Sequence, residues 1–67
     1  MTVARVTEIS STSATSFDDA VNEGVARATK TLRNVSGAWI KDQRVEVKGN
    51  RIVEYQVNLL ITFVLDD

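Results

Sequence analysis

The sequence contains no cysteine and no histidine among its 67 residues. Their absence excludes disulfide bonds, a thiol nucleophile, a zinc site built from Cys and His ligands, and a Ser-His-Asp triad. Covalent catalysis would need a nucleophile with a neighbouring base, and the chain shows no such pair. We therefore expect a protein that is not an enzyme.

An excess of positive charge and long apolar runs are missing as well. Eight Lys and Arg residues against nine Asp and Glu residues give a net charge of −1, without the basic patch that nucleic acid or a membrane surface would require. The apolar stretches fall far short of the roughly 20 residues of a membrane span, and the first residues do not follow a signal-peptide pattern. We expect neither nucleic acid nor membrane as a partner, and a cytoplasmic location.

The short chain leaves little room for a core. We expect residues 1–67 to form a single domain. A domain of this length buries only about 60% of the surface that its unfolded chain exposes. Because disulfides are excluded, burial against further copies of the chain is the expected source of stability, and we predict a homo-oligomer.

The beginning of the chain combines a strand pattern with a polar segment. Residues 2–9 alternate loosely between apolar and polar types and are rich in β-branched side chains, which predicts a short strand. Residues 10–16 are almost all Ser and Thr, whose side chains compete for backbone hydrogen bonds. This second segment is therefore predicted to be a loop that leads into a helix cap.

The clearest pattern is an apolar stripe at steps of three and four, which predicts an amphipathic helix with one buried face. Ser16 followed by Asp19 resembles a capping box at its start, and Gly37 suits its exit. Gly24 lies within the stripe and costs about 1 kcal/mol of helix propensity, so we expect the helix to lie close to a sheet there. The stripe consists of Phe17, Ala20, Val21, Gly24, Val25, Ala28, Leu32 and Val35.

Two long extended segments, residues 38–48 and 51–65, flank the dipeptide Gly49-Asn50. This dipeptide suits a two-residue turn, so the segments are predicted to form a hairpin. A regular ladder from that turn also places Arg44 opposite Tyr55. The further expected pairs are Lys48 with Arg51, Gln43 with Gln56, Lys41 with Asn58, and Trp39 with Leu60.

The single predicted helix can cover only one of the two faces of the predicted sheet. The helix should cover the row of Val57, Leu59 and Ile61, while Trp39 and Gln56 share the opposite face. Because soluble monomers rarely expose large apolar patches, we expect the opposite face to be a subunit interface, a ligand platform, or both. The plain alternative is a half-polar face in contact with water, as antiparallel sheets often have.

Several short segments carry a likeness to a known family, namely residues 12–13, 25–28, 30–33, 53–57 and 63–67. Together with the order strand, Ser/Thr segment, helix and hairpin, they span nearly the whole chain. On these residues the sequence resembles the dodecins, small flavin-binding proteins that assemble as hollow shells of twelve subunits.

The resemblance implies an α+β fold, with a β-α-β-β protomer whose three-stranded antiparallel sheet wraps around one helix. It also implies a homododecamer that stores a flavin (FMN, riboflavin or FAD) without turning it over. In the family pattern, a stacking Trp precedes an Arg and a Gln, which Arg44 and Gln56 match. Gly37 occupies the position of that Trp, and the only Trp of this chain lies two residues later, at Trp39.

Three residues are the candidates for binding a planar aromatic ligand. Trp39 offers a stacking surface, or packs at a subunit contact. Gln56 offers an amide donor and acceptor to a pyrimidine-like ring edge, or pairs with Gln43. Arg44 suits a phosphate, although its predicted place on the helix side favours a neighbour's carboxylate or stacking on Tyr55.

The alternative function is a flavin-free shell protein that binds a cation or another small ligand. Its motivation is Gly37 in the stacking position. Carboxylates gather at Asp18, Asp19 and Glu23 and again at Asp66 and Asp67, and their oxygens suit a hard cation. Helix capping and a frayed tail explain both groups more simply, so no metal ligand is assigned.

Overall fold

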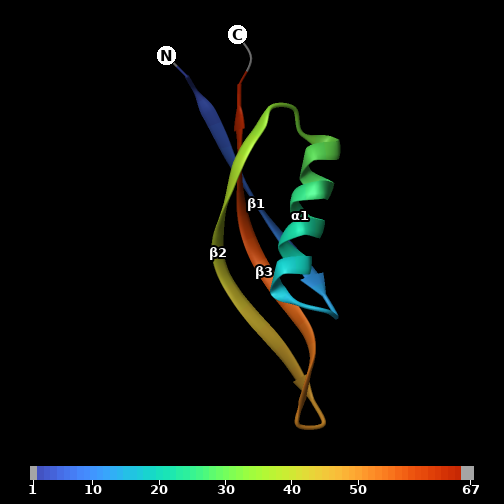
Figure 1. The fold of residues 1–67 in the computed structure, drawn as a ribbon. Helices are drawn as coiled ribbons and strands as arrows, with labels where there is room; N and C mark the ends of the chain where they lie inside the picture. The colour runs from blue at the N-terminus through green and yellow to red at the C-terminus, as the bar shows by residue number, and fades with distance from the viewer. Residues whose placement is uncertain (1, 66–67) are drawn as a thin grey trace.

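The computed structural model describes residues 2–65 and contains three strands and one helix. The elements are β1 (Ala4–Ser13), α1 (Phe17–Thr31), β2 (Val35–Lys48) and β3 (Arg51–Val64). The strands form one antiparallel sheet in the order β1-β3-β2, and α1 lies against one side of the curved sheet (Figure 1). The predicted α+β fold with β-α-β-β order is confirmed.

The first strand is longer than the sequence pattern predicted. β1 continues through Ser13, so the prediction of a loop at residues 10–16 is wrong for its first four residues. Ser10 pairs with Asn58, and Ser13 pairs with Tyr55. The ladder to β3 supplies the backbone hydrogen bonds for which the Ser and Thr side chains would otherwise compete, so tertiary pairing overrides the local preference.

The helix begins as predicted and ends earlier. The Ser16 side chain accepts a hydrogen bond from the Asp19 backbone N–H at 3.0 Å, which confirms the cap. At the other end the Leu32 N–H donates to the Ala28 carbonyl at 2.8 Å. The residue with left-handed backbone after the helix is Asn34, with φ of 62°, so the suggested place of Gly37 at the exit is wrong. Asn tolerates this conformation better than most residues.

The core between α1 and the sheet is small, and the helix packs closely on the sheet. Its fully or nearly fully buried apolar residues are Ala20, Ala28, Val57, Leu59 and Ile61. Gly24 is also buried, and a Cβ built there would lie 2.8 Å from Leu59 Cδ1 and 3.1 Å from Ser11 Cβ. The predicted close approach of helix and sheet at Gly24 is confirmed. The row Val57, Leu59 and Ile61 is the face that the helix covers, also as predicted.

The hairpin turn is confirmed, because Gly49 and Asn50 both have positive φ, 61° and 64°. This pair of left-handed residues is typical of the type I′ turn, whose twist matches that of paired strands. Lys48 pairs with Arg51 as predicted. The turn therefore fixes the register of the strand ends nearest to it.

The register departs from prediction over the middle of the hairpin. Gln43 pairs with Val57 and Asp42 with Asn58, so the expected pairs Gln43 with Gln56 and Lys41 with Asn58 are wrong. One shift lies between Glu46 and Val47, where β3 has the extra residue, and a second lies between Ile40 and Asp42, where β2 has it. The two bulges cancel, so the predicted pair Trp39 with Leu60 is confirmed.

The protein is markedly elongated. Its principal extents are 52 × 19 × 13 Å, and its radius of gyration of 13.8 Å exceeds the roughly 11 Å of a compact chain of this length. The accessible surface is 5065 Å², against about 4200 Å² expected for a compact monomer of this mass. No helix in the described part of the chain is long and apolar enough to cross a membrane.

A Gly24→Ala variant tests the close approach of helix and sheet. The added Cβ must displace Leu59 or the β1 backbone, at a cost of about 1–3 kcal/mol that outweighs the gain of about 1 kcal/mol in helix propensity. We expect a lower Tm in thermal unfolding. The matched control is Asn22→Ala on the exposed side of α1, which should leave Tm unchanged or raise it. A rise of Tm in both variants would contradict the packing of Gly24.

Candidate functional site

The candidate site is the outer face, which we define as the side of the sheet turned away from α1. Its centre is formed by nine residues, which lie in three rows across the strands. The row at one end contains Glu8, Leu60 and Trp39, the next contains Ser10, Asn58 and Asp42, and the third contains Thr12, Gln56 and Arg44. The described structure thus places all three predicted site residues, Trp39, Gln56 and Arg44, on one face.

Trp39 is the most exposed large apolar residue of the outer face. Its exposed fraction is 73%. Gly37, two residues earlier on β2, has no heavy atom within 4 Å of the place where a Cβ would lie. Leu60 is the direct partner of Trp39 on β3. An exposed indole with open space beside it and an aliphatic neighbour forms a flat apolar platform.

Gln56 is held in place from both neighbouring strands. Its Nε2 donates to Ser10 Oγ at 2.8 Å, and its Oε1 accepts from Arg44 Nη1 at 3.2 Å. The alternative of an amide pair with Gln43 is wrong, because Gln43 pairs with Val57 on the other side of the sheet. These two hydrogen bonds settle which way the amide of Gln56 points, because a flipped amide would place donor against donor.

Arg44 lies on the outer face and not, as predicted, on the helix side. The bulge between Glu46 and Val47 shifts β2 by one residue relative to β3, and a shift of one residue exchanges the two faces of a strand. Arg44 therefore does not stack on Tyr55, whose ring instead packs edge-to-face on Phe17 with centroids 5.1 Å apart. The second contact of Arg44 is an exposed ion pair with Glu46 at 3.4 Å.

The row between the tryptophan and the glutamine is polar. Asn58 Nδ2 donates to Asp42 Oδ1 at 2.5 Å. The extra residue of the bulge, Lys41, forms an exposed ion pair with Glu8 at 3.3 Å.

The two parts of the site lie apart within one copy. Leu60, the partner of Trp39, is four residues from Gln56 along β3, or about 13 Å. A ring that stacks on Trp39 must therefore extend over Asn58 to reach Gln56 of the same copy, or meet Gln56 of another copy.

The acidic group at the start of the helix has a structural role. Asp19 Oδ2 accepts a hydrogen bond from Ser13 Oγ at 2.6 Å, and Ser13 Oγ also accepts from the Thr15 N–H at 2.9 Å. Across residues 2–65 no three His, Cys, Asp or Glu side chains come together as a metal site. Asp66 and Asp67 lie outside the described residues.

Sequence reasoning missed Ser10 and Asp42 as parts of the outer face, whereas Asn58 lies on the face where the alternation of β3 predicts it. Ser10 was assigned to a loop, and the pairing of Asp42 with Asn58 depends on the bulge at Lys41. The sequence offered a weak signal only for Ser10, whose spacing from Glu8 continues the alternation of β1.

An elongated β-α-β-β chain with one covered and one open sheet face defines a small class of α+β proteins. The dodecin family model matches residues 3–66, and the chain belongs to the dodecin family. No curated protein matches the chain.

Solved structures support the same assignment. The dodecin of Streptomyces coelicolor is 32% identical, with a TM-score of 0.92 over 98% of this chain and 94% of that one. A dodecin variant from Thermus thermophilus is 31% identical, with a TM-score of 0.93 over 100% and 98% of the two chains. The calcium dodecin of Mycobacterium tuberculosis, a calcium-chelating antigen, is 28% identical, with a TM-score of 0.82 over 96% and 91%.

Proposed function

We propose that this protein is a non-catalytic flavin-binding and storage protein that works as a homododecamer in the cytoplasm. Membership of the dodecin family supports self-assembly. The observation that carries the proposal for the ligand is the outer face, on which exposed Trp39 shares one surface with the linked side chains of Gln56 and Arg44. The ligand is FMN, riboflavin or FAD, or a related planar aromatic molecule.

The proposed binding uses stacking for affinity and hydrogen bonds for orientation. The indole of Trp39 packs against the flat ring system, which buries apolar surface on both partners. Gln56 uses one amide hydrogen on Ser10 and one oxygen lone pair on Arg44, so it retains one donor and one acceptor for the uracil-like end of the ring. The guanidinium of Arg44 is oriented by its hydrogen bond to Gln56. Its remaining N–H groups can bind the ribityl phosphate of the ligand.

The separation of about 13 Å along β3 favours a site shared between copies. In this arrangement, one copy supplies the stacking surface of Trp39 and another supplies Gln56. Burial of Trp39 between copies would also cover the largest exposed apolar side chain of the outer face. Assembly and ligand binding are then two results of the same contact.

The role is binding, not turnover, because the outer face carries no nucleophile next to a base. The hydroxyl of Ser10 is used by Gln56, and the Asp42 carboxylate is used by Asn58. A face of this kind can hold a reactive ring and shield it from other molecules.

Titration with riboflavin tests the stacking role of Trp39. The wild-type protein should quench riboflavin fluorescence at micromolar concentration, and the single Trp should be quenched in parallel. Trp39→Ala should lower the affinity at least tenfold, because the stacking surface is lost, whereas Trp39→Phe should lose less. Thr29→Ala on the exposed side of α1 is the control. Equal affinity of Trp39→Ala and wild type would rule out stacking as the mechanism.

Gln56→Leu tests the orienting role of the amide. The variant keeps the size of the side chain but removes both hydrogen bonds to the ligand, so we expect riboflavin affinity to fall about tenfold, or about 1.4 kcal/mol. Asn22→Ala on α1 is the control. Unchanged affinity would place the polar edge of the ring elsewhere.

The second candidate function is binding of a cation by a flavin-free shell, and the likeness to a calcium-chelating dodecin favours it. Calorimetric titration of purified protein with calcium separates the two functions. The leading proposal predicts heat on addition of riboflavin and none on addition of calcium. Calcium binding at a fixed ratio per subunit, without riboflavin binding, would support the second function instead.

A further inference from the structure

A network of polar side chains crosses the outer face from one edge of the sheet to the other. Ser10 lies on β1, Gln56 on the central strand β3, and Arg44 on β2. Gln56 donates to Ser10 Oγ at 2.8 Å and accepts from Arg44 at 3.2 Å. Arg44 in turn forms its ion pair with Glu46 at 3.4 Å. We call these four side chains, which join all three strands, the cross-strand network.

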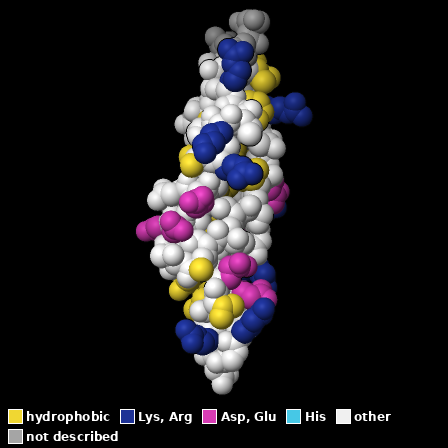
Figure 2. All heavy atoms as spheres, turned by 90° about the vertical axis from the view of Figure 1, so that its right-hand side faces the viewer, with side chains coloured by type: hydrophobic (Ala, Val, Ile, Leu, Met, Phe, Trp, Pro, Cys, Tyr) yellow, Lys and Arg dark blue, Asp and Glu magenta, His cyan; other side chains and the backbone are white. Residues whose placement is uncertain are grey.

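The side of the molecule that carries α1 has a different character. A space-filling view of that side shows acidic and basic side chains interspersed with small hydrophobic areas (Figure 2). Mixed charges of this kind favour neither anions nor cations over a distance. The cross-strand network, in contrast, presents its hydrogen-bonding groups in a fixed order, which is the kind of feature that can distinguish one ligand from another.

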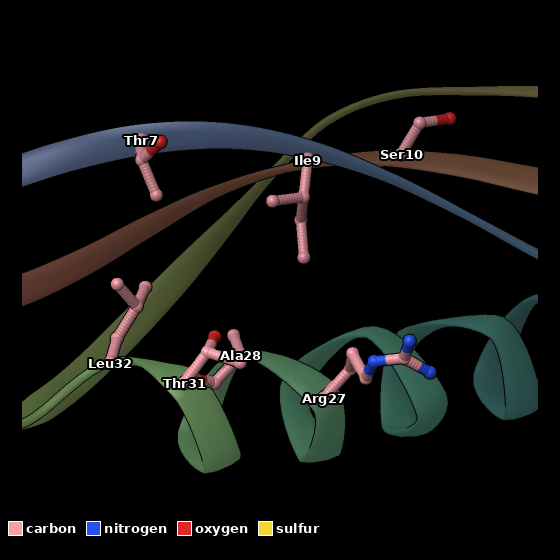
Figure 3. Close-up of a pocket in the computed structure, with 7 residues that line it drawn as sticks. All are labelled: Thr7, Ile9, Ser10, Arg27, Ala28, Thr31 and Leu32. Carbon is pink, nitrogen blue, oxygen red and sulfur yellow. The ribbon is translucent and has the colours of Figure 1, made fainter.

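The Ser10 side chain belongs to the outer face, although its strand also borders a groove. This open groove lies between β1 and the C-terminal half of α1. In the close-up view, the Ile9 side chain points toward the helix, whereas the Ser10 side chain points away from it (Figure 3). The alternation of β1 thus turns the Ser10 hydroxyl to the side where Gln56 lies.

A glutamine amide does not fix its own direction. The last side-chain torsion of Gln is broad and roughly two-fold, so a half turn exchanges the NH₂ group and the oxygen at little cost. In this structure, both ends of the Gln56 amide have a partner. Arg44 has donors only, so the amide oxygen must face β2, and the NH₂ group then faces Ser10 on β1.

Ser10 is the firmer of the two partners. Its hydrogen bond to Gln56 is the shorter one, 2.8 Å against 3.2 Å. A serine side chain is short and loses little conformational freedom when it is held, whereas an arginine side chain loses much more. The Arg44 side chain is also 62% exposed and is shared with Glu46. Without the Ser10 hydroxyl, only an exposed guanidinium would hold the amide.

The direction of the amide determines which ligand edge fits. One N–H and one oxygen lone pair of Gln56 remain free, with the donor toward β1 and the acceptor toward β2. A ring edge that carries a carbonyl oxygen beside an N–H, as in a cyclic amide, pairs with both. An edge whose nitrogen is alkylated leaves the Gln56 oxygen without a donor, which costs affinity when the ring covers it.

We propose that Ser10 is a positioning residue, which holds the Gln56 amide in one direction and so selects ligands with a cyclic amide edge. Ser10 acts through Gln56 and not by contact with the ligand. The inference rests on the proposed flavin binding and adds what makes the site selective.

A double-mutant cycle with riboflavin tests whether Ser10 acts through Gln56. Ser10→Ala should lower the riboflavin affinity about threefold, because one hydrogen bond that orients the amide is lost. The same change in a Gln56→Leu background should have no effect, because no amide remains to be positioned. Ser36→Ala is the matched control, since the Ser36 hydroxyl donates to the Thr62 carbonyl at 3.4 Å and lies outside the network.

A second ligand, 3-methylriboflavin, tests the selectivity. Its methyl group replaces the N–H of the cyclic amide, so the wild-type protein should prefer riboflavin about tenfold. In Ser10→Ala this preference should fall to about threefold, because an amide that turns freely can donate to a carbonyl of either ligand. Ser10→Thr keeps the hydroxyl and suits a strand, so it should restore both affinity and preference. Circular dichroism checks that each variant is folded.

The outcomes distinguish this inference from the proposed function. If wild type binds riboflavin but Ser10→Ala lowers the affinity equally with and without the Gln56 amide, the positioning role is wrong and flavin binding stands. An unchanged preference between the two ligands in folded Ser10→Ala leads to the same conclusion. If wild type does not quench riboflavin fluorescence, both proposals are wrong.

Discussion

The mismatch in length between one helix and its sheet determines most properties of this protein. Fifteen residues of helix cannot cover strands of 14 residues, because a helix rises less than half as far per residue as a strand. Within residues 2–65, the core therefore contains five buried apolar side chains. Both the outer face and the end of the hairpin remain open. This open surface is the reason why we propose association of copies as the source of further burial.

Much of the fold followed from local patterns because those patterns agree with the packing. The stripe from Phe17 to Leu32, the Ser16 cap and the Gly49-Asn50 turn each have a local physical cause, and each was predicted. Gly24 was informative because its cost in helix propensity pointed to a close approach. β1 was underestimated, because the pairing of Ser10 to Ser13 depends on a strand that is more than 40 residues away in the sequence.

The site was predicted only in part, and the hairpin explains why. Trp39 and Gln56 lie on the expected face, because the turn and the alternation of β3 fix their positions. Arg44 was assigned to the wrong side, because bulges leave little trace in a sequence, and β3 has one extra residue near Val53. The hydrogen bonds that join Ser10, Gln56 and Arg44 follow from that shift and could not be expected without it.

The two compensating bulges make the middle of the hairpin a separate unit. Because the two shifts cancel, the pairing at the turn and the pair of Trp39 with Leu60 do not depend on the register of the five residues between them, Asp42 to Glu46. Regular pairing without the two bulges would set Arg44 opposite Tyr55 and withdraw its guanidinium from the open surface. The bulges at Lys41 and Val53 therefore determine which side chains of β2 face a bound ligand. Ligand preference can thus differ between related chains that share the same scaffold.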